Sequence, residues 1–161
     1  MKIIAYIFYL LLIGLHMVIV RDVTSLLDAV INLPACLVLL VALYKDEVPV
    51  TWFGFLAGLV AAAGTPSRLG WYALLMAVLA LAACFVKERL NLDSLKAKLL
   101  LVLGGVFIHN VVSLIINGAD GFMLLLATSA LTGAVYTTLV AWLFFLFKEG
   151  KLTVEKIKSI F

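Results

Sequence analysis

The sequence predicts an all-α integral membrane protein, a bundle of six transmembrane helices with both termini in the cytoplasm. The 161-residue chain is 66% hydrophobic and only 13% charged, and its mean hydropathy is +1.24. Soluble domains are about half apolar and about a quarter charged, so this composition indicates a protein of the bilayer. The apolar residues fall into six runs, and basic residues concentrate at alternate breaks between them.

Each run is compared with the roughly 20 apolar residues that an α-helix needs to cross a bilayer. The expected helices cover about residues 3–20, 26–44, 48–63, 69–86, 99–116 and 122–147. The first run is long for a signal-peptide core and lacks a cleavage pattern, so it is expected to stay in the mature protein. Residues 1–147 form the expected transmembrane domain, and residues 148–161 form a basic cytoplasmic tail. For the tail, a short amphipathic helix and a solvated terminus both remain open.

Positive charge predicts the orientation, because Lys and Arg collect on the cytoplasmic side of membrane proteins. Six crossings place ten basic residues on one side and two on the other, and one crossing more or fewer destroys this segregation. The ten are Lys2, Lys45, Lys87, Arg89, Lys96, Lys98, Lys148, Lys151, Lys156 and Lys158, and the two are Arg21 and Arg68. The cytoplasmic charges are expected to lie near anionic membrane lipids. They form no nucleic-acid-binding motif, so no nucleic acid is expected as a partner.

A small-residue face occurs in the third expected helix. Gly54 and Gly58 form a G-x-x-x-G pair, and Ala57 and Ala61 extend it. In lipid, small residues allow two helix backbones to approach closely, so this face is expected to pack against another helix. A helix of this chain and a helix of another protein both remain open as its partner.

A loop is expected directly after this helix, at Gly64, Pro66 and Gly70. Glycine tolerates left-handed backbone conformations, and proline lacks the amide donor that a continuing helix needs. Irregular backbone at membrane depth requires protein or water to satisfy it, so the loop is expected near the outer surface or under its neighbours.

Residues 30–85 or so resemble the MreD family of rod shape-determining inner-membrane proteins. The resemblance lies in Pro34 before a Leu/Val run, a polar break at 45–47, the sequence GFLAGL, a G-x-P-x-x-LG element and a further apolar helix. Two positions depart from the family pattern, because Ala35 and Ala62 stand where its members often have acidic residues. Any role of those acids therefore does not carry over to this chain.

The resemblance implies a non-enzymatic scaffold of the bacterial cell-wall elongation complex, located in the cytoplasmic membrane. It implies binding to the bitopic protein MreC and association with the RodA glycosyltransferase and its penicillin-binding transpeptidase. MreB filaments are implied as indirect partners. The six-helix architecture is also similar to that of energy-coupling-factor S components. The alternative function is accordingly a substrate-binding membrane subunit of a vitamin transporter of that class.

Polar residues gather in the half of the bundle that is expected to face the exterior. They are His16, Asp28, Asn32, Arg68, His109, Ser113 and Asn117. Asp28 and Asn32 are expected one turn apart on the second helix, and Asp28 is expected to pair with Arg68. Three interpretations remain open: hydrogen bonds that hold the bundle together, a surface for partner helices, and an outward-facing pocket for a small molecule.

No catalytic motif is present, since the chain has no G-x-S-x-G, H-E-x-x-H or P-loop sequence. We therefore expect no enzymatic activity and no cofactor. No cysteine or carboxylate has ligand spacing with His16 or His109, so no metal is expected. Cys36 and Cys84 lie in apolar runs, where a thiol acts as a small hydrophobic group.

Overall fold

The computed structural model describes residues 2–20, 30–90, 92, 94–118 and 121–148. Their regular secondary structure is helical throughout, with no strand among these residues, so the predicted all-α class is confirmed for them. The helices are α1 (Lys2–Leu15), α2 (Leu33–Tyr44), α3 (Glu47–Ala61), α4 (Leu69–Arg89), α5 (Leu95–Ile116), α6 (Phe122–Leu125) and α7 (Thr132–Lys148). A π-helical segment, His16–Val20, extends α1; a 3-10 turn, Pro66–Arg68, precedes α4; and a π-helical segment, Leu126–Leu131, joins α6 to α7.

Six helical rods result, as the six apolar runs predict, but they differ in length. Three are long and apolar enough to cross a membrane: 66–89 with 24 residues, 95–116 with 22 and 122–148 with 27. The apolar helices at 4–18, 33–44 and 47–61 are shorter. At a rise of 1.5 Å per residue, α2 covers roughly 18 Å, against a hydrocarbon core of about 30 Å.

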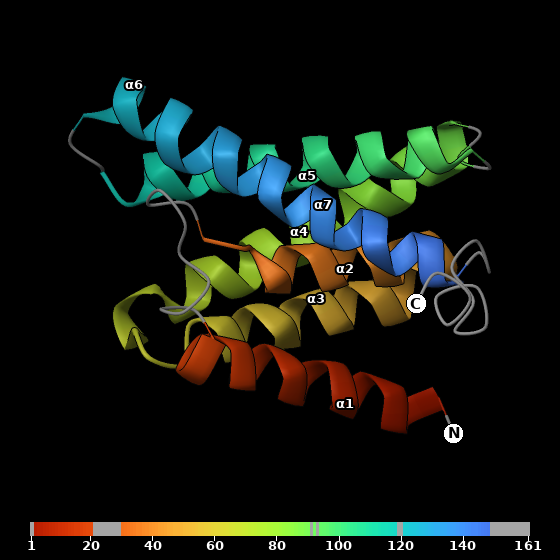
Figure 1. The fold of residues 1–161 in the computed structure, drawn as a ribbon. Coiled ribbons are helices and arrows are strands. Elements are labelled where there is room, and N and C mark those ends of the chain that lie inside the picture. Colours follow the sequence, from red (N-terminus) through yellow and green to blue (C-terminus); the bar gives the residue numbers. More distant parts are fainter. Residues whose placement is uncertain (1, 21–29, 91, 93, 119–120, 149–161) are drawn as a thin grey trace, which may run out of the picture.

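Successive rods run in opposite directions, so the start of α1 and the end of α7 lie at the same end of the bundle (Figure 1). The helix termini at this end carry Lys45, Lys87, Arg89, Lys96, Lys98 and Lys148. We name this end of the bundle the lysine end. Arg68 lies at the opposite end, before α4. The basic residues within the described ranges are therefore segregated along the bundle. Arg21 and the expected tail from residue 149 onward lie outside the described residues.

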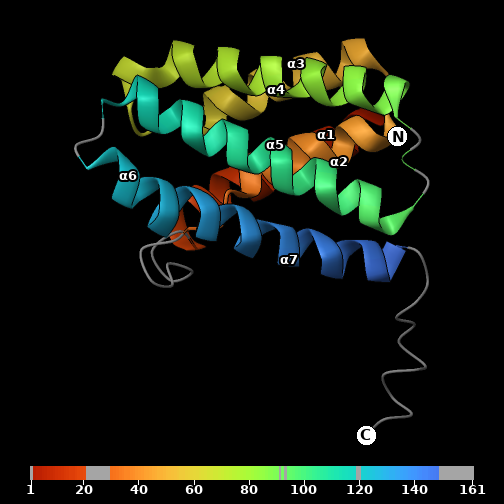
Figure 2. The same ribbon diagram turned by 90° about the horizontal axis from the view of Figure 1, so that it is seen from above.

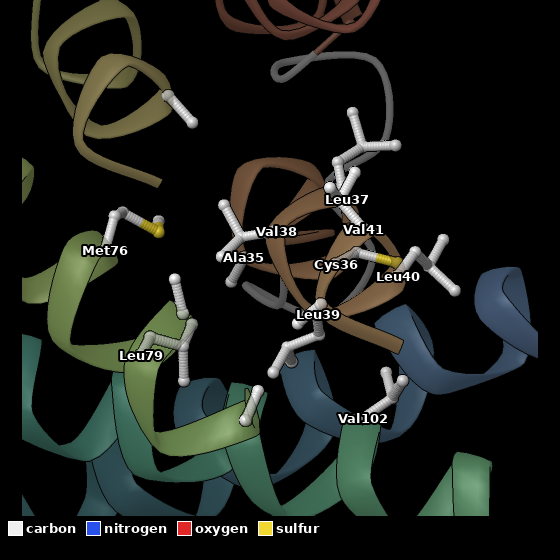
Figure 3. Packing of buried hydrophobic residues seen from close by; sticks show 14 of the residues in the cluster. Ala35, Cys36, Leu37, Val38, Leu39, Leu40, Val41, Met76, Leu79 and Val102 are labelled. Atoms are coloured by element: carbon white, nitrogen blue, oxygen red, sulfur yellow. The ribbon is translucent and has the colours of Figure 1, made fainter. Parts of the chain in front are cut away.

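Helix α2 lies at the centre of the bundle. It contacts α1, α3, α4, α5 and α7, and every residue from Pro34 to Ala42 is buried. Figure 3 shows its side chains pointing in several directions, with Met76 of α4 and Val102 of α5 around them. A helix that is apolar on all sides is expected to be surrounded by protein. Ala35, in the first turn of α2, is fully buried in this core.

The start of α2 differs from the expectation. Residues 30–32 are not helical, and α2 begins at Leu33 instead of near residue 26. The side chain of Asn32 caps the helix by accepting a hydrogen bond from the amide of Ala35, and Pro34 occupies the first turn, where its missing N–H costs nothing. The prediction that Asn32 lies on a face within the second helix is therefore wrong. Its expected neighbour, Asp28, lies outside the described residues.

The small-residue face of α3 packs against α4 of the same chain (Figure 2). Gly54, Ala57 and Gly58 are buried, and the half-buried Ala61 packs against the core. A Cβ atom at Gly54 would lie 2.7 Å from the carbonyl oxygen of Met76, so the backbones are in contact. Of the two partners that the sequence left open, a helix of the same chain, α4, lies against Gly54 and Gly58.

The loop after α3 uses a different geometry from the one expected. Gly64 and Pro66 are exposed, and Pro66 opens the 3-10 turn that reverses the chain. Gly70 is wrongly predicted as a loop residue, because it lies in the first turn of α4. Within the described ranges, left-handed glycines occur instead at Gly118 (φ 58°) and Gly121 (φ 72°), between α5 and α6. The turn that begins at Pro66 achieves the reversal without a left-handed residue.

Candidate functional site

Asn32 is the centre of a hydrogen-bond network inside the bundle, in the half away from the lysine end. Its Nδ2 donates to Nδ1 of His109 at 2.9 Å and to Oδ1 of Asn110 at 2.8 Å. Its Oδ1 accepts from the backbone amide of Ala35 at 3.2 Å. Both amide hydrogens and the carbonyl oxygen of this side chain are therefore used. The result is a polar connection between the start of α2 and the second half of α5.

Helix α7 joins the same network through a threonine. The backbone amide of Asn32 donates to Oγ1 of Thr137 at 3.0 Å, and this hydroxyl donates to the carbonyl of Gly133 at 2.7 Å. Asn110 adds a second link, because its Nδ2 donates to the carbonyl of Ala130 at 3.2 Å. We name the four residues Asn32, His109, Asn110 and Thr137 the Asn32 network.

A small residue in α7 allows the chain before α2 to reach this position. A Cβ atom at Gly133 would lie 3.2 Å from the carbonyl oxygen of Val30, which is tighter than an ordinary contact. The absence of a side chain at Gly133 thus permits residues 30–32 to lie directly against α7. This close approach places the amide of Asn32 within reach of Thr137.

The network determines which ring nitrogen of a neutral His109 carries the proton. The amide nitrogen of Asn32 can only donate, so Nδ1 of His109 accepts, and in a neutral imidazole the proton then lies on Nε2. His109 is 3% exposed, and its Nε2 has no hydrogen-bond partner among the described residues. A buried polar group without a partner costs free energy, and such groups commonly bind an ordered water.

A narrow crevice opens between α4 and α5, one turn of α5 beyond this histidine at Ser113. It is lined by Arg68, Trp71, Tyr72, Leu75, Ser113, Ile116 and Asn117, and its internal volume is about 10 Å³. The hydroxyl of Ser113, one helical turn from His109, is also buried without a partner among the described residues. This volume holds about one water molecule, whereas organic ligands occupy pockets of about 300–1,000 Å³.

The structure divides the expected outer polar cluster into separate groups. Asn32 and His109 belong to the Asn32 network, whereas Arg68, Ser113 and Asn117 line the crevice. The remaining histidine, His16, is 5% exposed and bonds through Nε2 to the carbonyl of Ile31 at 3.1 Å, which holds the π-helical end of α1 against the residue before Asn32. The expected ion pair between Asp28 and Arg68 involves a residue outside the described ranges.

Two residues of the network were not expected from the sequence. Asn110 lies directly after His109, and Thr137 lies in the apolar stretch GAVYTTLVAW of α7. An amide next to a histidine in the middle of an apolar helix is a usable signal, because polar groups at membrane depth need partners. Thr137 carries no such signal, since threonine can satisfy its hydroxyl within its own helix.

A second set of polar contacts lies at the lysine end. The ammonium group of Lys87 donates to the carbonyl oxygens of Ala42 at 2.9 Å and Lys45 at 2.6 Å. These are carbonyls at the C-terminus of α2, which lack intrahelical partners and carry partial negative charge. Nζ of Lys148, in α7, lies 2.9 Å from the ring centroid of Tyr44. The end of α2 is thus attached to α4 and α7 by cations.

The interactions of the Asn32 network are hydrogen bonds between described residues. Among the described residues, no group of three or more His, Cys, Asp or Glu side chains is placed to hold a metal ion. Cys36 and Cys84 are buried free thiols. The bonds from Asn32 to His109, Asn110 and Thr137 connect separate helices, and the crevice between α4 and α5 has room for about one water.

Over the residues that the structure describes, the fold is all-helical, with three helices long and apolar enough to cross a membrane and a polar network that joins α2, α5 and α7. Compared with protein-family models, with characterised proteins and with solved structures, the chain gives no match.

Proposed function

We propose that the chain is a non-enzymatic membrane scaffold of the bacterial cell-wall elongation complex, embedded in the cytoplasmic membrane. The observation that carries the scaffold role is the Asn32 network. Its donors and acceptors link helices to one another, and the adjoining crevice has room for about one water. A protein of this kind acts by holding its own helices, and through them its partners, in a defined arrangement.

The surface of the bundle supports the membrane location. Large apolar side chains are exposed around its periphery, for example Leu11 at 68%, Val18 at 82%, Leu100 at 68% and Met123 at 78%. Soluble monomers rarely expose large contiguous apolar patches, whereas lipid tails solvate exposed apolar side chains. In this proposal the shorter helices α1, α2 and α3 cross with the help of flanking polar residues and local thinning of the bilayer.

Charge segregation supports an orientation with the lysine end in the cytoplasm. Lys and Arg collect on that side of membrane proteins, and among the described basic residues only Arg68 lies at the opposite end. The first residue of α1 and the last residue of α7 then both face the cytoplasm. The test is a set of reporter fusions: fusions after Lys148 are expected to report a cytoplasmic location and insertions at Gly118 an exterior one.

The cell-wall role rests on the resemblance to MreD around Pro34 and in the segment from Gly54 to Gly70. In this proposal the chain binds an MreC-type bitopic protein and, with it, RodA and the penicillin-binding transpeptidase. The partner helix uses faces other than the G-x-x-x-G pair, because Gly54 and Gly58 already pack against α4.

Copurification from mild detergent tests this function. A bitopic protein with a large exterior domain is expected to remain bound to the tagged chain, and depletion of the chain is expected to convert rod-shaped cells to spheres. Recovery of a bound vitamin or of paired ATPases would instead establish the vitamin-transporter alternative. Retention of rod shape after full depletion would contradict a role in elongation.

A further inference from the structure

An apolar groove runs between α5 and α7 on the outside of the bundle. It is lined by Leu99 and Leu103 of α5 and by Val135, Thr138, Leu139 and Trp142 of α7, and its volume is about 400 Å³. Figure 2 shows these two helices side by side along their lengths. The lining residues extend over about two turns of α7, which corresponds to roughly 10 Å along the helix axis.

The walls of the groove are almost entirely apolar. Thr138 is the only polar residue in the lining apart from the indole of Trp142, and its hydroxyl donates to the carbonyl of Ala134 at 2.7 Å. Leu139 and Val135 are about half exposed, at 51% and 47%. The surface therefore favours a flexible hydrocarbon occupant, because four of its six lining residues are Leu or Val and the Thr138 hydroxyl is already bonded.

The turn of α5 that precedes the groove carries a cation. Lys96 is exposed and lies one turn before Leu99, so the two residues share a face of α5. The start of α5 is close to the end of α7, because Nζ of Lys98 lies 6.0 Å from the ring centroid of Phe145. An occupant with an apolar chain along the groove thus has its polar end at the lysine end of the bundle.

We propose that this groove binds an acyl chain of one anionic phospholipid, whose phosphate is held by Lys96. The proposal rests on the membrane location proposed above. Basic residues between helices on the cytoplasmic side are the setting in which anionic headgroups are recognised. The combination of an apolar groove and a cation on the preceding turn of α5 matches the two parts of such a lipid.

A transmembrane helix of another protein fits the groove less well. Helix association in lipid depends on small residues that let backbones approach, and the lining consists of Leu, Val, Thr and Trp. Leucine and tryptophan side chains keep an approaching backbone at a distance, whereas a single acyl chain can lie between them.

Tryptophan quenching by brominated lipids tests the proposal on the full chain in vesicles. The chain has three tryptophans, and Trp52 and Trp71 are 64% and 59% exposed, so W52F with W71F leaves Trp142 in the groove as the only indole. Brominated phosphatidylglycerol in phosphatidylcholine vesicles is compared with brominated phosphatidylcholine in phosphatidylglycerol vesicles. Quenching of Trp142 is expected to show about fivefold preference for phosphatidylglycerol, the enrichment that one basic residue near the surface provides.

The matched variants are Lys96→Gln and Arg89→Gln. Lys96→Gln is expected to abolish the preference. Arg89→Gln is expected to leave it intact, because Arg89 lies at the same end but on α4, over the ring of Phe85. Equal quenching by both lipids would show an unselective lipid-facing surface and overturn the proposal, and so would absence of quenching, which would show that protein covers Trp142. Failure of the chain to float with the vesicles would contradict the membrane location itself.

Discussion

Asn32 donates a hydrogen bond to His109 at 2.9 Å across a separation of 77 residues in the sequence. The donor lies just before α2 and the acceptor lies in the second half of α5, so the bond fixes the start of the central helix relative to α5. Because the same amide also bonds Asn110, its geometry is defined from two directions.

Replacement of Asn32 tests how much this network contributes to the free energy of unfolding. Asn32→Ala removes the bonds to His109, Asn110 and the amide of Ala35, and we expect the free energy of unfolding to fall by about 2 kcal/mol. Thermal unfolding in mild detergent measures this change, with reaction of the buried Cys36 thiol as the readout. Thr128→Ala is the control, because that hydroxyl bonds only the carbonyl of Leu124 in its own rod. Equal losses in the two variants would contradict a bundle-holding role.

Adjacent threonines of α7 provide a second, closely matched comparison. Thr137 accepts from the amide of Asn32, whereas Thr138 bonds only the carbonyl of Ala134 one turn earlier. Thr137→Val leaves the Asn32 amide without its partner and is expected to cost about 1 kcal/mol more than Thr138→Val. The same unfolding assay measures the difference. If Thr138→Val proved the more damaging change, the assigned link between α2 and α7 would be wrong.

The effect of replacing a glycine by alanine is expected to depend strongly on how close the neighbouring helix lies. A Cβ atom at Gly58 would lie 2.6 Å from Cα of Ala73, a contact that backbone atoms cannot relieve without moving α3 from α4. Gly58→Ala is expected to lower the free energy of unfolding by about 2 kcal/mol or more. Gly70→Ala has open space around the added methyl group and lies within α4, so it is expected to raise stability by about 0.5 kcal/mol. Tolerance of Gly58→Ala would show that the helices are farther apart than described.

The hydrogen bonds of Lys87 predict that its ammonium group stabilises the lysine end of the bundle. Lys87→Met keeps the length of the side chain but leaves the carbonyls of Ala42 and Lys45 without their ammonium donor. We expect a loss of about 1–2 kcal/mol in the free energy of unfolding. Arg89→Met serves as the comparison, since the guanidinium of Arg89 lies 4.8 Å from the ring centroid of the exposed Phe85, and its loss is expected to cost less than half as much. A larger effect at Arg89 would reverse this assignment.

Hydropathy alone predicts the six rods and their approximate positions, because each rod is apolar over most of its length. The residue at which each helix begins is harder to predict. The second helix was expected from residue 26, yet Asn32 caps it and Leu33 begins it, since a polar side chain that satisfies a free amide competes with continued helix. Residues 30–32 are apolar enough to hide that change.

The site was predicted only in part, because its bonds join residues far apart in the chain. The i, i+4 spacing identified His109 and Ser113, but only the fold brings Asn32 to His109 and Thr137 to Asn32. The G-x-x-x-G pair was recognised as a packing face, whereas the sequence left open which helix covers it. The answer depends on the Cα–Cα approach of α3 and α4, which no local pattern encodes.

Helix α2 contacts α3, α4, α5 and α7, and its residues from Pro34 to Ala42 are all buried. The volume of its side chains therefore limits how closely the surrounding helices can approach. Leu39 faces Gly105 of α5, where an added Cβ atom would lie 2.8 Å from Cδ1 of Leu39, so a residue larger than leucine at this position would displace α5 from inside the bundle.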